Sequence, residues 1–225
     1  MRLIFVRHGE PNYEKDCLTD LGLKQAQAAA KRLMREGIEG IYSSPQGRAI
    51  ETARAYAQLD GGKDVQVLDF MHEISWGSTD GEPLFNNGHP WTIADEMVAQ
   101  GWDLTRSDWR EHPFFKRNKA AACADAVAKE LDKWLLTLGY RREGGYYRQI
   151  LPEDNRHTYA LFSHGGSSTA ALSHLMDLPF PYMLSLLHMP FTAIVILRFD
   201  TKPNSLCLPH LELAGDSAHC ATVEQ

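Results

Sequence analysis

Arg2-Leu-Ile-Phe-Val-Arg-His-Gly-Glu10 opens the chain with a short apolar run that ends abruptly in charge and glycine. Such a run, from Leu3 to Val6, predicts a buried strand. Thr19 is then a candidate N-cap, because its hydroxyl can accept from the first free N–H groups of a helix. An apolar helical face follows it at three- and four-residue steps, at Leu23, Ala26, Ala30 and Leu33. This stretch therefore predicts a strand that leads into a helix.

The same strand-to-helix pattern recurs along the chain. Further strands are predicted at residues 38–42, 65–70, 159–162, 193–199 and 207–213, further helices at 46–58, 127–138 and 167–176, and a polar loop at 141–145. Strands that alternate with helices predict one layered α/β domain over residues 1–225, with a mostly parallel central sheet and helices on both faces. From Ser78 to about Asn118 the sequence is rich in Gly, Pro, Trp and charge, which predicts an inserted cap.

Composition narrows the classes of function. The 225 residues are 44% hydrophobic, enough for a sizeable core, and the formal net charge of -6 argues against nonspecific nucleic-acid binding. Four cysteines without a CxxC pair are typical of reduced thiols, and the N-terminal residues lack the features of a signal peptide. No apolar run approaches the length of a membrane span. We expect a cytoplasmic protein with no membrane or nucleic-acid partner; the oligomeric state is open.

Three predicted strand-to-helix junctions carry groups that suit a phosphate. Arg7-His8-Gly9-Glu10 follows the first strand, Ser43-Ser44-Pro45 with Arg48 follows the second, and Ser163-His164-Gly165-Gly166 follows a later one. Ligands of open α/β sheets bind beyond the carboxyl ends of the strands. The three junctions are therefore expected to bring two imidazoles, two guanidiniums and helix N-termini into one crevice, which predicts a site for a phosphate group.

These residue types also suit phosphoryl transfer. A neutral imidazole is a good nucleophile near neutral pH, and arginines neutralise the oxygens of the transferring group. One histidine would attack while the other donates to the phosphoryl group. The leaving oxygen needs a proton, and Glu73, which follows the third predicted strand, is the best candidate acid.

Four ordered motifs resemble those of the histidine phosphatase superfamily, the group that includes cofactor-dependent phosphoglycerate mutase and its phosphatase relatives. They are Arg7-His-Gly9, Leu18-Thr-Asp-Leu-Gly-Leu-Lys-Gln-Ala26, Ser43-Ser-Pro-Gln-Gly-Arg-Ala-Ile-Glu-Thr-Ala53 and Ser163-His-Gly-Gly166, with a late echo at Leu213-Ala-Gly-Asp-Ser-Ala-His219. The likeness touches most of the chain outside the insertion. It implies a phosphoglycerate mutase-like fold.

The resemblance also implies roles. His8 would be the phosphorylated nucleophile, Arg7, Arg48 and His164 would complete the phosphate pocket, and the Gly165 amide would add a further donor. Glu73 would be the proton donor. Neither a metal nor another cofactor is implied. The expected activity is that of a metal-independent, histidine acid phosphatase-type hydrolase of a small phosphorylated metabolite.

The chain departs from the family pattern at two places. Where many members carry an asparagine six residues after the nucleophile, this chain has Glu14, and the nearest asparagine is Asn12. The Arg- and Pro-rich segment that mutases place after the acid is absent, which favours hydrolysis over mutase-type transfer. The mutase reading and a non-catalytic phosphate-binding module are the remaining alternatives.

Other hydrolase chemistries lack their motifs. No cysteine is followed six residues later by arginine, and neither a DxDxT nucleophile, a P-loop lysine, HExxH nor G-x-S-x-G occurs.

The insertion is predicted to set substrate choice or, equally, only to cover one end of the sheet. Its aromatic side chains could form an apolar wall and its cations could bind a second anionic group: Trp91, Trp102, Trp109, Phe114, Phe115, Arg106, Arg110, Lys116 and Arg117.

Overall fold

The fold is that of a computed structural model, which describes residues 1–221 and 223. The strands are β1 (Arg2–Arg7), β2 (Pro11–Asn12), β3 (Cys17–Leu18), β4 (Gly40–Ser43), β5 (Val65–Val67), β6 (Tyr140–Glu143), β7 (Tyr146–Gln149), β8 (Thr158–Ser163), β9 (Ile194–Arg198), β10 (Leu206–Cys207) and β11 (His210–Asp216). The α-helices are α1 (Asp20–Leu33), α2 (Gly47–Leu59), α3 (Pro90–Ala99), α4 (Pro113–Lys116), α5 (Lys119–Thr137), α6 (Gly165–Leu175) and α7 (Phe180–Leu186).

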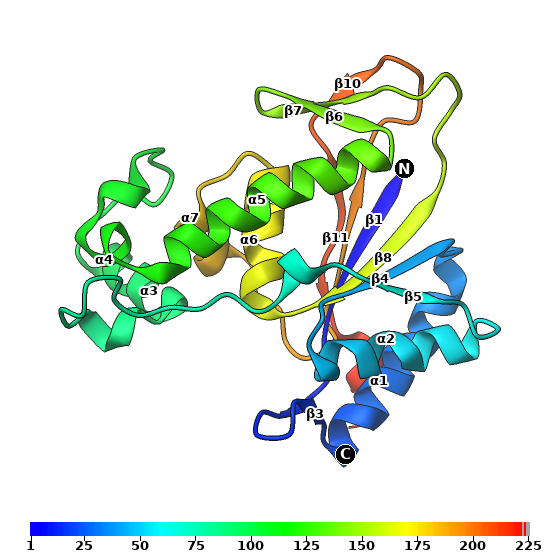
Figure 1. Cartoon of the computed structure of the whole chain (residues 1–225), viewed down its shortest axis with the longest axis horizontal. Coiled ribbons are helices and arrows are strands. Elements are labelled where there is room, and N and C mark those ends of the chain that lie inside the picture. Colours follow the sequence, from blue (N-terminus) through cyan, green and yellow to red (C-terminus); the bar gives the residue numbers. More distant parts are fainter. Residues whose placement is uncertain (222, 224–225) are drawn as a thin grey trace.

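Six strands form the central sheet, in the order β11-β9-β1-β8-β4-β5. Strand β1 pairs with β8 in parallel, β8 with β4 and β4 with β5 likewise, whereas β9 and β11 run antiparallel at one edge. The predicted mostly parallel sheet is therefore confirmed. The carboxyl ends of β1, β8 and β4 meet at one rim, opposite the end where the N-terminus lies (Figure 1).

The alternation of β1 divides the core into two layers. Leu3 and Phe5 join the apolar cluster that includes side chains of α5, α6 and α7, whereas Ile4 and Val6 join the cluster with side chains of α1 and α2. Because successive side chains of a strand point to opposite faces, an unbroken apolar run indicates a strand buried on both faces. Helices accordingly cover both faces of the sheet, with α1 and α2 on one side and α5 and α6 on the other (Figure 1).

The segment of residues 78–118 lies against the N-terminal part of α5. It contains α3, α4 and short 3-10 turns, and it reaches well to the side of the central sheet in Figure 1. Its start and end are held together, because Ser78 bridges to Asn118 and the Thr79 amide donates to the Arg117 carbonyl at 2.8 Å. Helix α3 packs against α7, which brings its first turn close to the rim of the sheet.

Three local predictions are wrong. Residues 141–145 are not a loop: they lie in the β6–β7 hairpin, in which Tyr140 and Tyr147 are fully buried beneath the charged side chains of the other face. Leu23 is 45% exposed, so the buried face of α1 instead includes Gly22 and Gln25. The strand expected at 207–213 is divided, because β10 pairs with β7 in a small separate sheet while β11 joins the central one.

No helix among the described residues is both long and apolar enough to cross a membrane.

Candidate active site

Two backbone approaches fix the first strand-to-helix junction. A Cβ atom at Gly9 would lie 2.5 Å from the carbonyl oxygen of Gly22, and one at Gly22 would lie 2.1 Å from that of Glu10. Both distances are impossible for a side chain. Glycine is therefore needed in both of the first two motifs, because the turn after β1 packs directly on the start of α1.

The predicted residues converge at the rim of the sheet. His8 follows β1, Ser44 follows β4, His164 follows β8, and Arg48 lies in the first turn of α2. The His8 and His164 rings lie 5.0 Å apart at an angle of 62°. Both imidazoles and the Arg48 guanidinium are buried, so their charges act in a poorly solvated space.

The hydrogen bonds of His8 define its tautomer. Nδ1 donates to the carbonyl oxygen of Gly9 at 2.7 Å, so the proton resides on Nδ1 and Nε2 carries the lone pair. Arg48 Nε donates to that nitrogen at 3.4 Å. Burial, reinforced by the positive charges of Arg7 and Arg48, lowers the pKa of His8 to about 3. The imidazole is consequently neutral, with its free nitrogen inside the site.

His164 presents a buried ring nitrogen to the site. Its Nε2 lies 2.7 Å from Ser44 Oγ, and Ser44 Oγ also accepts from the Gln46 amide. We assign the hydroxyl proton of Ser44 to His164 Nε2, which leaves the proton of the ring on Nδ1. Within the described residues Nδ1 has no hydrogen-bond partner. Burial, with the nearby His8, Arg48 and Arg7, lowers the pKa of His164 far below its usual range.

Hydrogen bonds to Met189 and Asp16 hold the guanidinium groups of Arg7 and Arg48 in place. Arg7 donates to the carbonyl oxygen of Met189 at 2.6 Å, while its Nε is buried without a partner among the described residues. Arg48 donates to Asp16 Oδ1 at 2.5 Å, and Asp16 Oδ2 accepts from the Gly47 amide at 2.7 Å. Burial lowers the pKa of Arg7, but a guanidinium stays charged at neutral pH.

The carboxyl group of Glu73 packs against the first turn of α6, beside the second histidine motif. Its Oε1 accepts from the amides of Ile74 at 2.9 Å and Ser167 at 3.0 Å, and its Oε2 accepts from Gly166 at 3.4 Å. Burial raises the pKa of Glu73, although these amides act in the opposite direction. A Cβ at Gly166 would lie 2.6 Å from Oε1, so the second glycine of His164-Gly-Gly makes room for this carboxyl group.

The hairpin formed by β2 and β3 carries Asn12 and Glu14, the two residues considered for the family's asparagine position. Asn12 accepts from the Lys15 amide at 3.1 Å, and Glu14 is exposed. Tyr13 lies between them in the chain and is close to both arginines of the site. Its ring centroid lies 5.4 Å from Arg48 Cζ. Sequence reasoning missed Tyr13, as it did Asp16, because only the folded hairpin brings them to the arginines.

A cavity of about 370 Å³ opens beside Arg7 and Gly165. Trp91 lines it, together with His89. His188 also lines this cavity, whereas His72 is exposed and its Nδ1 lies 3.0 Å from the Glu73 carbonyl oxygen.

The other parts of the insertion lie elsewhere. Trp102 lines a separate cavity, and Trp109 is packed in the core. Within the described structure, none of the four predicted cations lines the cavity beside Arg7. Each of them forms an ion pair with a carboxylate: Arg106–Asp108, Arg110–Asp125, Lys116–Glu111 and Arg117–Asp80.

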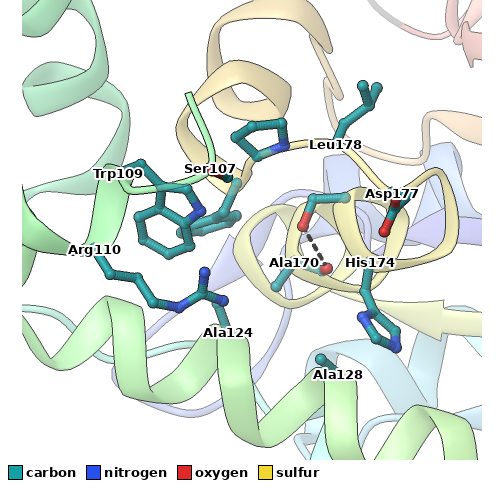
Figure 2. Close-up of a pocket in the computed structure, with 12 residues that line it drawn as sticks. Ser107, Trp109, Arg110, Ala124, Ala128, Ala170, His174, Asp177 and Leu178 are labelled. Atoms are coloured by element: carbon teal, nitrogen blue, oxygen red, sulfur yellow. Dashed lines mark hydrogen bonds between the residues drawn. The ribbon is translucent and has the colours of Figure 1, made fainter. Parts of the chain in front are cut away.

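Another cavity, of about 260 Å³, lies between α5, α6 and the segment that includes Ser107. Figure 2 shows Trp109 and Arg110 on one side of it and His174 and Asp177, at the end of α6, on the other. None of the candidate catalytic residues lines this cavity.

The sequence matches a family model and is similar to known proteins. Residues 3–208 match the family model described as histidine phosphatase superfamily (branch 1). A putative phosphoserine phosphatase 2 of Hydrogenobacter thermophilus is 31% identical over 112 residues, which cover 45% of this chain and 52% of that protein. A 2,3-bisphosphoglycerate-dependent phosphoglycerate mutase of Thermoplasma acidophilum is 34% identical over 117 residues, covering 44% and 58% respectively. The matches thus span little more than half the length of these relatives.

Solved structures share the fold over nearly the whole chain. A mutant phosphoserine phosphatase from Entamoeba histolytica, in complex with phosphoserine, has a TM-score of 0.62 at 22% identity and covers 97% of this chain and 98% of its own. A mycobacterial glucosyl-3-phosphoglycerate phosphatase, in complex with VO3, has a TM-score of 0.60 at 22% identity, with coverage of 95% and 98%. At 22% identity, the structural likeness to these proteins shows the fold alone.

Proposed function

Because the chain belongs to the histidine phosphatase superfamily (branch 1), we propose that it hydrolyses phosphate monoesters of small metabolites through a phosphohistidine formed on Nε2 of His8. The observation that carries the proposal is the state of this nitrogen. It is unprotonated, because Nδ1 donates to Gly9, and it faces the guanidinium of Arg48. A neutral nucleophile surrounded by positive charge suits attack on a phosphate dianion.

In the first step the lone pair of Nε2 attacks phosphorus, and the bond between phosphorus and the ester oxygen breaks. The Nδ1–H bond to the Gly9 carbonyl supports the positive charge that develops on the ring. The unpartnered donors at the site, Arg7 Nε and His164 Nδ1, would bind the oxygens of the transferring group together with the Gly165 amide.

Glu73 would protonate the leaving oxygen. Its raised pKa keeps the carboxyl group protonated to higher pH than an ordinary glutamate, and an alkoxide leaves poorly without a proton. In the second step, the Glu73 carboxylate would accept a proton from water as the water oxygen attacks phosphorus. The bond between phosphorus and Nε2 then breaks, which releases phosphate and restores both side chains.

Hydrolysis is favoured over mutase-type transfer. A mutase must hold a bisphosphorylated intermediate, which requires positive charge for a second phosphate. Among the described residues that line the cavity, Arg7 is the only arginine or lysine. The site is also proposed to work without a metal: the described residues include no group of three or more His, Cys, Asp or Glu side chains that could hold one. EDTA is expected to leave activity intact, and loss restored by a divalent ion would contradict this part of the proposal.

The direct test is to stop the wild-type reaction and analyse the protein. A phosphoryl group that is labile in acid and stable in alkali is expected, and it should be absent from His8→Ala together with phosphate release. His210→Ala is the matched control, since His210 is exposed on β11 at the edge of the sheet. A phosphoryl group on another residue type, or turnover by folded His8→Ala, would overturn the mechanism. Absence of turnover by the wild type on a broad panel of esters would favour a non-catalytic phosphate-binding module.

A further inference from the structure

Trp91 stands at the junction between the proposed phosphate pocket and the cavity beside it. A Cβ atom at Gly165 would lie 3.5 Å from Trp91 Cζ2 and 3.7 Å from Arg7 Cζ. The indole and the guanidinium therefore both lie close to Gly165, whose amide is proposed to bind the phosphoryl group. With its phosphoryl group bound at that amide, an ester would extend its alcohol portion along Trp91.

Apart from Arg7 and the imidazoles of His89 and His188, no ionisable side chain among the described residues lines this cavity. Arg7 is its only arginine or lysine among the described residues, and no Asp or Glu lines it. Arg7 is proposed to bind the phosphoryl group, so it is not available to the alcohol portion. His89 Nδ1 lies 2.9 Å from Thr92 Oγ1 and accepts from the Thr92 amide, so the ring proton lies on Nε2. Burial lowers the pKa of His89, which keeps this imidazole uncharged.

The walls do offer neutral hydrogen-bonding groups and one flat apolar face. Thr169 Oγ1 donates to the Gly165 carbonyl at 2.7 Å, so its oxygen remains free to accept from a ligand hydroxyl. Ser185, at the end of α7, adds an exposed hydroxyl at the rim. The Trp91 indole is half-buried and can pack against the C–H face of a ring.

We propose that the alcohol portion of the substrate is uncharged and bears several hydroxyls, as in a polyol or sugar phosphate. This inference rests on the phosphatase function proposed above and names its substrate class. A carboxylate in the cavity would lose part of its hydration and meet no arginine or lysine other than Arg7, and an ammonium would meet no carboxylate among the described residues. Hydroxyls, in contrast, meet the side chains of Thr169, Ser185 and His89.

Glycerol 3-phosphate and 3-phosphoglycerate form a matched pair of ligands, because a hydroxymethyl group in one replaces the carboxylate of the other. Both would be titrated calorimetrically into His8→Ala, or His8→Gln if the first variant fails to fold, at pH 8, where ordinary histidines are uncharged. We expect glycerol 3-phosphate to bind at least tenfold more tightly. Equal or tighter binding of 3-phosphoglycerate would overturn the proposal.

A cation placed in the cavity provides the complementary test. Ser185→Lys should improve the binding of 3-phosphoglycerate at least fivefold relative to glycerol 3-phosphate. Ser107→Lys is the control, because Ser107 is also exposed but lines the cavity shown in Figure 2. The same gain in both variants would mean that net charge, rather than the composition of this cavity, sets the preference.

Removal of the Trp91 indole tests the binding of the alcohol portion separately from the binding of the phosphate. Trp91→Ala should weaken glucose 6-phosphate at least fivefold while inorganic phosphate binds as before; unchanged glucose 6-phosphate binding would count against the stacking role. These titrations require no turnover. A failure of the proposed hydrolysis would appear in phosphate release by the wild type, whereas a failure of the substrate class appears only in the order of affinities.

Discussion

Arg48 Nε lies 3.4 Å from His8 Nε2 and donates to it. The contact joins the proposed nucleophile to a guanidinium whose far end is fixed by Asp16. It occupies the lone pair that would attack phosphorus, so a bound phosphate has to draw the Nε–H group toward its own oxygens. The geometry therefore predicts that Arg48 both keeps Nε2 free of a proton and, once substrate arrives, neutralises the phosphoryl group.

Arg48→Lys tests this dual role. Lysine keeps one positive charge but cannot donate to His8 and to Asp16 from a rigid planar fork. We expect kcat/KM to fall by about 10²-fold, the loss that removal of one oriented donor usually brings. Arg35→Lys is the control, because Arg35 is exposed in the 3-10 turn Met34–Glu36 that follows α1. An Arg48→Lys enzyme with near-normal kcat/KM would show that charge alone suffices.

Glu73→Gln should discriminate between leaving groups. An alkyl phosphate needs protonation of its oxygen, so its kcat is expected to fall by about 10²–10³-fold, whereas an aryl phosphate with an acidic phenol should lose only a few-fold. Because burial raises the pKa of Glu73, wild-type turnover of the alkyl ester should decline as pH rises through that pKa. The decline should be absent from the variant. Equal losses on both esters would contradict the assignment of Glu73 as the acid.

The sequence predicted the convergence of Arg7, His8, Arg48 and His164, because each follows or lies beside the carboxyl end of a strand in a parallel sheet. That rule depends only on the order of strands and helices, which hydrophobic patterns reveal well. The hydrogen-bonding partners of these residues could not be predicted in the same way. Ser44 was visible as part of a motif, but nothing in its spacing showed that its hydroxyl meets a histidine 120 positions later.

Local composition misled where tertiary packing decides the structure. Arg141 and Arg142 made the β6–β7 hairpin resemble a solvated loop, yet the strands form because Tyr140 and Tyr147 are buried against Phe199. In the insertion, too, local sequence could not predict which side chains reach the site. Its tryptophans were indistinguishable in sequence, and only the fold places Trp91 beside Arg7 and Trp109 in the core.

Acid should destabilise the protein through the buried imidazole of His8. Its pKa is about 3 in the folded state and 6.5 ordinarily, so between these values the unfolded chain binds the extra proton. The free energy of unfolding should therefore fall as pH drops from about 6.5 to about 3, by about 1.4 kcal/mol per pH unit for this one group. Urea unfolding of His8→Gln across this range should show a slope shallower by that amount. An unchanged slope would mean that His8 titrates normally in the folded protein.

Trp109→Ala should affect stability and leave substrate preference unchanged. The Trp109 side chain is 3% exposed, and its ring lies 5.0 Å from that of Phe115 and 6.0 Å from that of Phe180. Its truncation leaves a cavity at the junction of the insertion with α7, which should cost about 3–5 kcal/mol of unfolding free energy in urea titrations. Trp91→Ala, at a half-buried position, should cost less.

The ratio of kcat/KM for an aryl phosphate to that for glucose 6-phosphate separates the two tryptophans further. Measured below the unfolding transition, the ratio should stay at the wild-type value in Trp109→Ala and rise in Trp91→Ala, since only the second indole flanks Gly165. A shifted ratio in Trp109→Ala with little loss of stability would mean that Trp109 acts on the substrate rather than on the packing of the insertion. Because both variants remove the same side chain, the difference between them isolates its position in the fold.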